Sequence, residues 1–335
     1  MISQDKHGGN IYSNNICLDF SVNINPLGLP LAVADAVHKA GSLLEAYPEY
    51  EAKSLQGKIA DTLNIEAERI VVTSGASEAF MAINHAYNPT DGYICCPCFS
   101  GYEHALCAVD ARVNKLTTLS DYENVNQYEG GVFYIANPNN PDGICVASDI
   151  VERVIRSVAA LGGIAVVDEC FLPLSNSYNQ SIIEKNLPNN VFVVRSFTKT
   201  FAMPGIRLGY VVCGSTDNAA MVRRQLPEWN VSGIAIAAGM AALDCMDEIS
   251  RARDLILVER EFLTEELTKL GMQVKKSDAN FILFSGPLGL REKLIDKGIL
   301  IRDCSNYDSL GPGYYRVAVK DRDSNRMLIK MMERL

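Results

Sequence analysis

The sequence predicts an α/β fold in which a mostly parallel central sheet is flanked by helices. Short runs of apolar residues recur through residues 69–213, and they are apolar throughout rather than at alternate positions. Such runs are typical of strands that are buried on both faces of a parallel sheet. Helical patterns such as Ile150–Leu161 separate several of them, which favours right-handed crossover connections. The expected strands are Arg69–Thr73, Tyr93–Cys96, Gly131–Ala136, Ile164–Asp168, Val191–Arg195 and Leu208–Cys213.

The last third of the chain has a different pattern, which predicts a smaller α+β domain. A long helical stretch, Ile234–Leu270, is rich in Ala, Glu and Arg. Short strands are expected near residues 273–274, 281–284, 299–302 and 315–319, and a final helix over Ser324–Arg334. Strands and helices grouped in this way are typical of an α+β unit.

Composition and charge exclude several classes of function. The 335 residues carry a net charge of −9, which argues against nucleic acid and anionic membranes as partners. No apolar run reaches the length of about 18 residues that a membrane span needs, and residues 1–7 lack the apolar core of a signal peptide. The ten cysteines are scattered except for Cys95–Cys98, which lacks the second cluster or the histidines of a zinc site. We therefore expect no metal, buried reduced thiols and a cytoplasmic protein.

The segment Ser196–Tyr210 carries the clearest chemical signal. Lys199 lies in a hydroxyl-rich turn, and Arg207 follows eight residues later. Ser196 and Thr198 can donate hydroxyl hydrogen bonds to a phosphate, and the guanidinium of Arg207 can bind one with two N–H groups. The pattern predicts a lysine that binds a cofactor as a Schiff base next to a phosphate site. A lone lysine would more often be a solvated surface residue.

A second anion site is indicated by Thr73–Glu78, where a strand leads through a tight turn into a helix that is expected to begin at Glu78. Backbone N–H groups at a helix N-terminus, together with the helix dipole, favour an anion. By itself the pattern is equally consistent with a helix that is capped by Ser77. Beside the Lys199 segment, it predicts the other half of the phosphate site.

Together these motifs resemble the cofactor-binding signature of the fold-type I pyridoxal-phosphate (PLP) enzymes, the aspartate aminotransferase superfamily. The resemblance implies the fold-type I architecture, PLP as the cofactor and Lys199 as a catalytic residue. It also implies that Gly75, Ala76 and Ser77 hold the cofactor phosphate. On the same basis we expect a large domain over residues 40–235 and a small domain formed by residues 1–39 and 236–335.

Three residues match positions around the cofactor ring in this superfamily. Asp168 ends an apolar strand, where a carboxylate is costly unless it is paired. The resemblance places Asp168 against the pyridine nitrogen, with a helix cap as the alternative. Asn140 matches the asparagine at the 3-oxygen of the ring, although a run such as Asn137–Gly143 is usually a plain turn. Phe99 matches the side chain that stacks on the ring, with Tyr102 as a substitute and core packing as the alternative.

Three more residues match or depart from the superfamily pattern. Phe171 stands where many aminotransferases have a tyrosine that bonds the 3-oxygen, so that hydrogen bond is expected to be absent. Tyr47 resembles the tyrosine that reaches the cofactor phosphate of a neighbouring subunit, which implies a homodimer with shared sites. Arg316 matches the arginine that binds the substrate α-carboxylate bidentately, and a surface arginine on a strand is the alternative.

Three stretches, together with Phe171, resemble the L-threonine-O-3-phosphate decarboxylases of the cobalamin pathway, which are related to histidinol-phosphate aminotransferases. The stretches are His7–Asn10, Asp19–Gly28 and Ile299–Tyr307, and the resemblance spans essentially the whole chain. It implies that His7, Asn23 and Arg302 hold the substrate phosphate. Alternatively, His7 is a terminal residue without a role, Asn23 forms a turn, and Arg302 forms a structural ion pair. The short connection between Asn10 and Asp19 departs from the family and leaves the geometry of His7 open.

The expected activity is a PLP-dependent decarboxylation of threonine phosphate or serine phosphate to an aminoalkyl phosphate. The sequence leaves the choice between the two substrates open, because one methyl group changes discrimination by only about 1–3 kcal/mol. An aminotransferase similar to the histidinol-phosphate enzymes is the alternative, since it would use the same cofactor residues. A non-catalytic PLP-binding regulator is a third hypothesis, but such proteins usually carry a DNA-binding segment for which we see no room.

Overall fold

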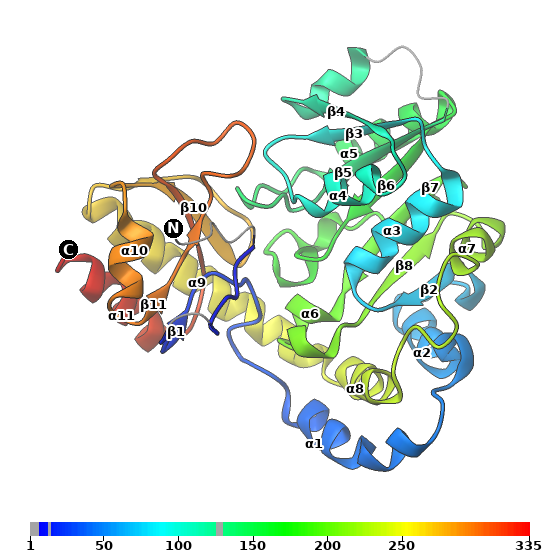
Figure 1. The fold of residues 1–335 in the computed structure, drawn as a ribbon, viewed down its shortest axis with the longest axis horizontal. Coiled ribbons are helices and arrows are strands. Elements are labelled where there is room, and N and C mark those ends of the chain that lie inside the picture. Colours follow the sequence, from blue (N-terminus) through cyan, green and yellow to red (C-terminus); the bar gives the residue numbers. More distant parts are fainter. Residues whose placement is uncertain (1–6, 13–14, 125–129) are drawn as a thin grey trace.

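A seven-stranded sheet forms the larger part of the molecule (Figure 1). The structure is a computed structural model that describes residues 7–12, 15–124 and 130–335. The strand order is β2-β8-β7-β6-β5-β3-β4, and β8 runs antiparallel to both of its neighbours while the other pairs are parallel. The strands are β2 (Ile70–Thr73), β3 (Asp91–Cys95), β4 (Arg112–Leu116), β5 (Gly131–Ala136), β6 (Ile164–Asp168), β7 (Val191–Ser196) and β8 (Gly209–Cys213). This arrangement confirms the expected α/β class.

Both faces of the sheet are buried, as the continuous apolar runs predict. In β5, Val132 and Tyr134 belong to one apolar cluster, whereas Phe133 and Ile135 belong to another. Successive side chains of a strand point to opposite faces, so the two clusters lie on opposite sides of the sheet. One cluster includes α3 (Ala76–Tyr87), α4 (Gly101–Cys107) and α7 (Thr216–Arg223), and the other includes α2 (Lys53–Leu63), α5 (Ser148–Ala160) and α8 (Gly233–Leu243).

Two elements differ from the sequence-based expectation. Strand β4 (Arg112–Leu116) lies at the edge of the sheet and is half-exposed and polar, so it lacks the apolar run that marks the other strands. The single helix that was expected over Ile234–Leu270 is divided at Asp244–Cys245 into α8 and α9 (Met246–Lys269). The division lets α8 pack under the large sheet while α9 continues to the second part of the molecule (Figure 1).

The second part is built on a four-stranded antiparallel sheet of order β12-β13-β10-β9. Its elements are β9 (Gln273–Val274), β10 (Phe281–Ser285), α10 (Leu290–Ile295), β12 (Arg302–Asp303), β13 (Tyr314–Ala318) and α11 (Arg322–Met332). A short strand near the N-terminus, β1 (Leu18–Asp19), pairs in parallel with β11 (Ile299–Leu300). The strand that was expected over 299–302 is thus two strands with different partners.

The N-terminal segment connects the two parts. After β1, the chain runs to α1 (Leu31–Lys39), which packs against α8 (Figure 1). The expected domain division at residues 39 and 236 stays a prediction. The remaining helices are α6 (Phe197–Thr200) and the 3₁₀ helices Ala40–Glu45, Tyr50–Ala52, Ala67–Arg69, Leu119–Asn124, Leu172–Leu174, Tyr178–Gln180 and Pro204–Ile206.

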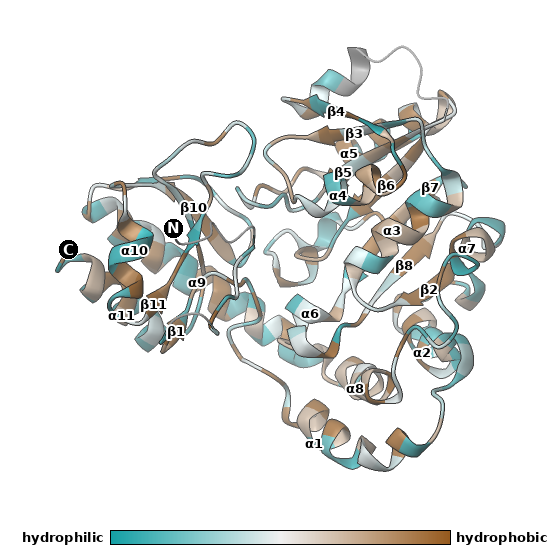
Figure 2. Ribbon diagram, in the orientation of Figure 1, coloured by the Kyte–Doolittle hydropathy of each residue, from teal (hydrophilic) through white to brown (hydrophobic). Residues whose placement is uncertain are grey.

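Hydropathy follows these layers. Figure 2 shows hydrophobic residues along the strands of the large sheet and hydrophilic residues on outlying helices such as α2 and α7. Within the described ranges, no helix is both long enough and apolar enough to cross a membrane.

Candidate active site

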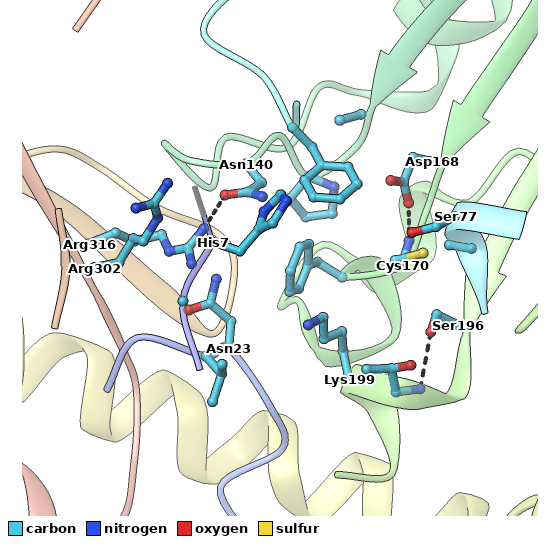
Figure 3. Close-up of a pocket in the computed structure, with 18 of the residues that line it drawn as sticks. His7, Asn23, Ser77, Asn140, Asp168, Cys170, Ser196, Lys199, Arg302 and Arg316 are labelled. Atoms are coloured by element: carbon cyan, nitrogen blue, oxygen red, sulfur yellow. Dashed lines mark hydrogen bonds between the residues drawn. The ribbon is translucent and has the colours of Figure 1, made fainter. Parts of the chain in front are cut away.

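A cavity of about 330 Å³ lies between the large sheet and the small one, at the carboxyl ends of β5, β6 and β7. Carboxyl ends of parallel strands are the usual ligand-binding edge of an open α/β sheet. Most of the residues that the sequence singles out line this cavity. They are His7, Asn23, Ala76, Ser77, Phe99, Asn140, Asp168, Ser196, Thr198, Lys199, Arg207, Arg302 and Arg316. Figure 3 shows Arg302 and Arg316 on one side, Asp168, Ser77 and Ser196 on the other, and Lys199 between them.

One end of the cavity is formed by the first turn of α3. The helix begins at Ala76, so the expected start at Glu78 is wrong by two residues, and Ala76 and Ser77 themselves lie in the turn that favours anions. Gly75 precedes the helix with a φ of 85°, and a Cβ there would lie 2.7 Å from Nη2 of Arg207. The residue must therefore be glycine for the guanidinium to lie against the helix start.

Lys199 projects from α6, directly after β7. Ser196 caps this short helix, and its Oγ accepts a hydrogen bond from the backbone N–H of Thr198 at 3.1 Å. Burial, and then the positive charge of Arg316, lower the pKa of Lys199 to about 8. Because the neutral amine is the nucleophilic form, Lys199 is suited to react with an aldehyde near neutral pH.

Asp168 ends β6 and faces the cavity with both carboxylate oxygens partnered. Its Oδ1 accepts a hydrogen bond from the backbone N–H of Cys170 at 2.9 Å, and its Oδ2 accepts one from the hydroxyl of Tyr102 at 2.7 Å. Burial raises the pKa of Asp168, and these hydrogen bonds to the charged form act in the opposite direction. The sequence does not predict the contact with Tyr102, because the two residues are 66 positions apart.

Aromatic rings form the walls around Lys199. Phe99 lines the cavity and meets the ring of Tyr102 edge-on, with 5.6 Å between ring centroids. Phe171 also lines it, and the Nζ of Lys199 lies 5.9 Å from the centroid of its ring. Phe171 packs in turn against Phe281 at 5.0 Å. Phe171, which stands where many aminotransferases have a tyrosine, thus makes apolar contacts at this position.

The other end of the cavity carries two buried arginines. Arg302 of β12 and Arg316 of β13 lie directly opposite each other in the sheet, so their side chains leave the same face. Arg316 donates to Asn140 Oδ1 and to the backbone oxygen of Ser21, while its buried Nε has no hydrogen-bond partner among the described residues. The alternative of a surface arginine is therefore wrong for Arg316. Arg302 donates to Asn306 Oδ1 at 2.8 Å, and its guanidinium carbon lies 5.6 Å from the ring centroid of Tyr307.

His7 and Asn23 complete this end. The ring of His7 lies 6.0 Å from that of Phe99, so the described residues bring the N-terminal segment over the cavity. Asn23 is buried, and its Oδ1 has no partner among the residues that the structure describes. Part of the short connection between Asn10 and Asp19, residues 13–14, lies outside the described residues.

Several residues of the site or near it were missed or placed elsewhere. Ser21, Tyr307 and Cys170 line the cavity without a signal in the local sequence that marks them as site residues. Tyr47 is 80% exposed and packs on Trp229 at 4.5 Å, away from this cavity wall. Arg322 follows the strand of Arg316 but does not line the cavity, and it is paired with Glu259. His, Cys, Asp and Glu side chains of the described ranges form no group of three suited to a metal ion.

Comparisons with known proteins show the family to which the chain belongs. The family model of the class I and II aminotransferases matches residues 15–332. A putative threonine-phosphate decarboxylase of Caldanaerobacter subterraneus subsp. tengcongensis is 31% identical over 98% of this chain and 94% of that protein. The adenosylcobalamin biosynthesis bifunctional protein CobDQ of Leptospira interrogans is 28% identical over 97% of this chain, which spans only 40% of that longer protein. The crystal structure of the histidinol-phosphate aminotransferase from Clostridium acetobutylicum has a TM-score of 0.85 at 27% identity, over 94% of this chain and 98% of that one.

The chain therefore belongs to the class I and II aminotransferase family, and it is a PLP-dependent enzyme of fold type I. The cavity also fits this cofactor by its own chemistry. A lysine with a lowered pKa can bind an aldehyde, a helix start with an arginine can bind a phosphate, and a buried carboxylate can pair with a ring nitrogen.

Proposed function

We propose that the enzyme decarboxylates a phosphorylated amino acid, threonine phosphate or serine phosphate, and releases an aminoalkyl phosphate and carbon dioxide. The observation that carries this proposal is the pair Arg302 and Arg316, which lie opposite each other at the end of the cavity away from the helix start of α3. One guanidinium suits the α-carboxylate that every amino acid has. The second suits another anionic group on the same substrate, such as a phosphate.

The charge around the cavity supports an anionic ligand. The protein as a whole carries a net charge of −9, yet Lys199, Arg207, Arg302 and Arg316 all line one cavity. Two arginines that are buried at one end repel each other, and an anionic ligand bound between them would offset that repulsion. We propose that Arg316 binds the carboxylate and that Arg302, His7 and Asn23 bind the phosphate.

The cofactor-binding residues have separate tasks in this proposal. Bound PLP takes up the electron pair that is released when a bond at the substrate α-carbon breaks. Lys199 would hold the cofactor. Its neutral amine could accept a proton at the α-carbon, and its protonated form could return one. Asp168 would pair with the ring nitrogen and keep it protonated. Gly75, Ala76, Ser77, Ser196, Thr198 and Arg207 would hold the phosphate, Phe99 would stack on the ring, and Asn140 would bind its 3-oxygen.

The orientation of the substrate decides which bond breaks. Because Arg302 and Arg316 would hold the two anionic ends of the substrate, they would fix the rotation about the bond between the amine nitrogen and the α-carbon. Phe171 and the relatives named as threonine-phosphate decarboxylases support loss of the carboxylate. The similarity to histidinol-phosphate aminotransferase keeps transamination as the second candidate, since it would use the same cofactor residues.

We also propose that the working unit is a homodimer, and that the protein acts in the cytoplasm. In the single chain Ser77 and Arg207 are exposed, so the phosphate end of the cavity is open. Tyr47 is itself exposed and packs on the exposed side chain of Trp229, and Leu44 is exposed as well. A second copy that buries these apolar residues could place its Tyr47 over the open end of the cavity.

A panel of substrates tests the reaction directly. The holoenzyme is mixed with threonine phosphate, serine phosphate and histidinol phosphate, with and without a 2-keto acid. We expect carbon dioxide from threonine phosphate or serine phosphate without any requirement for the keto acid. Amine exchange that depends on the keto acid, with no carbon dioxide, would replace the proposal with the aminotransferase.

A further inference from the structure

The geometry points to Tyr102 as a positioning residue that fixes the carboxylate of Asp168 for the ring nitrogen of the cofactor. This inference rests on the role that is proposed above for Asp168. This role differs from the one that the sequence suggested, in which Tyr102 could replace Phe99 as the side chain that stacks on the cofactor ring.

The ring of Tyr102 is held on three sides by other aromatic rings. Tyr102 is 1% exposed and stacks on Tyr134 at 5.0 Å with an interplanar angle of 14°. Phe80 and Phe99 meet it edge-on at 5.1 and 5.6 Å. A ring with these contacts cannot swing without disturbing the core, so the direction of its hydroxyl is fixed.

That hydroxyl can act only as a donor toward Asp168. Burial, and then the negative charge of Asp168, raise the pKa of Tyr102 well above its ordinary value, so the phenol keeps its proton. It donates to Oδ2 at 2.7 Å, while the backbone N–H of Cys170 donates to Oδ1 at 2.9 Å. One donor on each oxygen prevents rotation of the carboxylate and favours its charged form.

These two hydrogen bonds matter because burial by itself favours the neutral form of Asp168. Asp168 lies at the wall of the cavity, where burial raises its pKa. A carboxyl that took up a proton, or turned its plane, would hold a protonated ring nitrogen less well. Removal of the Tyr102 hydroxyl should therefore weaken the contact with that nitrogen more than any other contact with the cofactor.

The test compares PLP with an analogue in which a C–H group replaces the ring nitrogen. Dissociation constants of both are measured on the apoenzyme by absorbance, without substrate. The wild type is expected to prefer PLP, and Tyr102→Phe is expected to reduce that preference roughly tenfold. A loss of affinity that is the same for PLP and the analogue, or no loss at all, would overturn the inference, since a merely structural role affects both alike.

Tyr134→Phe is the matched control. It removes a hydroxyl from the same aromatic stack, one that donates to Asn84 at 2.8 Å, while Tyr134 does not line the cavity. It is expected to lower the melting temperature of the apoenzyme but to leave the preference for PLP unchanged. An equal loss of preference in both variants would assign the effect to the stack and count against Tyr102.

One further variant separates the failure of this inference from that of the proposed site. Asp168→Asn should abolish the preference for PLP, and if it does not, the proposed role of Asp168 fails. If Asp168→Asn loses the preference and Tyr102→Phe keeps it, only the role of Tyr102 fails.

Discussion

The two ends of the cavity are assembled in different ways. The end around Arg207 and Lys199 is formed by two short segments, residues 75–78 shortly after β2 and residues 196–209 between the end of β7 and the start of β8. The end around Arg302 and Arg316 gathers side chains from the N-terminal segment, the loop after β5 and the small sheet. The first end is suited to a cofactor that the whole family shares. In the proposed function, the second end distinguishes one reaction from another. The following predictions test this difference between the two ends, from the largest expected effect to the smallest.

Lys199→Ala should abolish turnover, because no other lysine of the described residues lines the cavity. The purified variant should also yield no pyridoxyl adduct after borohydride reduction, as measured by mass spectrometry of the peptide that contains residue 199. Lys276→Ala, at an exposed position, is the control and should behave like the wild type. Residual turnover in Lys199→Ala would remove this residue from the site and with it the whole assignment of the first end.

Arg302→Ala should lower kcat/KM for threonine phosphate roughly 100-fold, which corresponds to about 3 kcal/mol for the loss of a buried charged partner. Binding of unphosphorylated threonine, followed by the absorbance of the bound cofactor, should change little. Arg316→Ala is the contrasting variant, since it should weaken both amino acids alike through their carboxylates. If Arg302→Ala also weakens both equally, Arg302 does not belong to a phosphate site.

Tyr47→Ala should lower the activity of the enzyme roughly tenfold if a partner subunit supplies this side chain to the phosphate end of the cavity. The decisive measurement mixes unfolded Tyr47→Ala and Lys199→Ala chains and refolds them together. In a symmetric dimer with shared sites, mixed dimers contain one site with both residues intact, and roughly a quarter of the wild-type activity should return. If activity stays at the level of the separate variants, the sites are not shared across a dimer.

The rate of PLP uptake by the apoenzyme should rise with pH and level off above about pH 8. The neutral amine is the reacting form, and burial together with Arg316 lowers the pKa of Lys199 to about 8. A lysine with the ordinary pKa of about 10.4 would give a rate that still increases beyond pH 9. Arg316→Gln removes one cause of the shift and should move the profile to higher pH. If the pH dependence of PLP uptake is unchanged in Arg316→Gln, the charge of Arg316 does not lower the pKa of Lys199.

The sequence predicts the first end well because its chemistry is local. Ser196, Lys199 and Arg207 lie in one short segment that runs from the end of β7 to just before β8, so their spacing alone indicates a phosphate site. The helix start at Ala76 was misjudged by two residues, since helix boundaries depend on backbone geometry that residue types specify weakly. Position 75 is an example of what the local sequence does not contain. Glycine is required there because the side chain of Arg207, which is distant in the sequence, lies against it.

The second end and the contacts behind the site are harder to predict, because they depend on tertiary structure. Arg302 and Arg316 could be named only through resemblance to a family, since nothing local shows that they face each other across a sheet. The hydrogen bond from Tyr102 to Asp168 joins α4 to the end of β6, and no pattern along the chain announces it. Strand β4 was not predicted for a simpler reason. It is an exposed edge strand, and such a strand does not need an apolar run.

The register of β12 against β13 has a consequence for how the enzyme could change its substrate. Directly opposite residues of an antiparallel pair have Cα atoms only about 4.5–5.5 Å apart, and the sheet holds that spacing rigidly. In the proposed function, this spacing limits the distance between the two negative charges that the guanidinium groups can bind on one small molecule. A variant that is selected for a longer molecule would have to slip the whole strand by two residues or abandon one arginine, so we expect evolution along this lineage to alter the surrounding loops first.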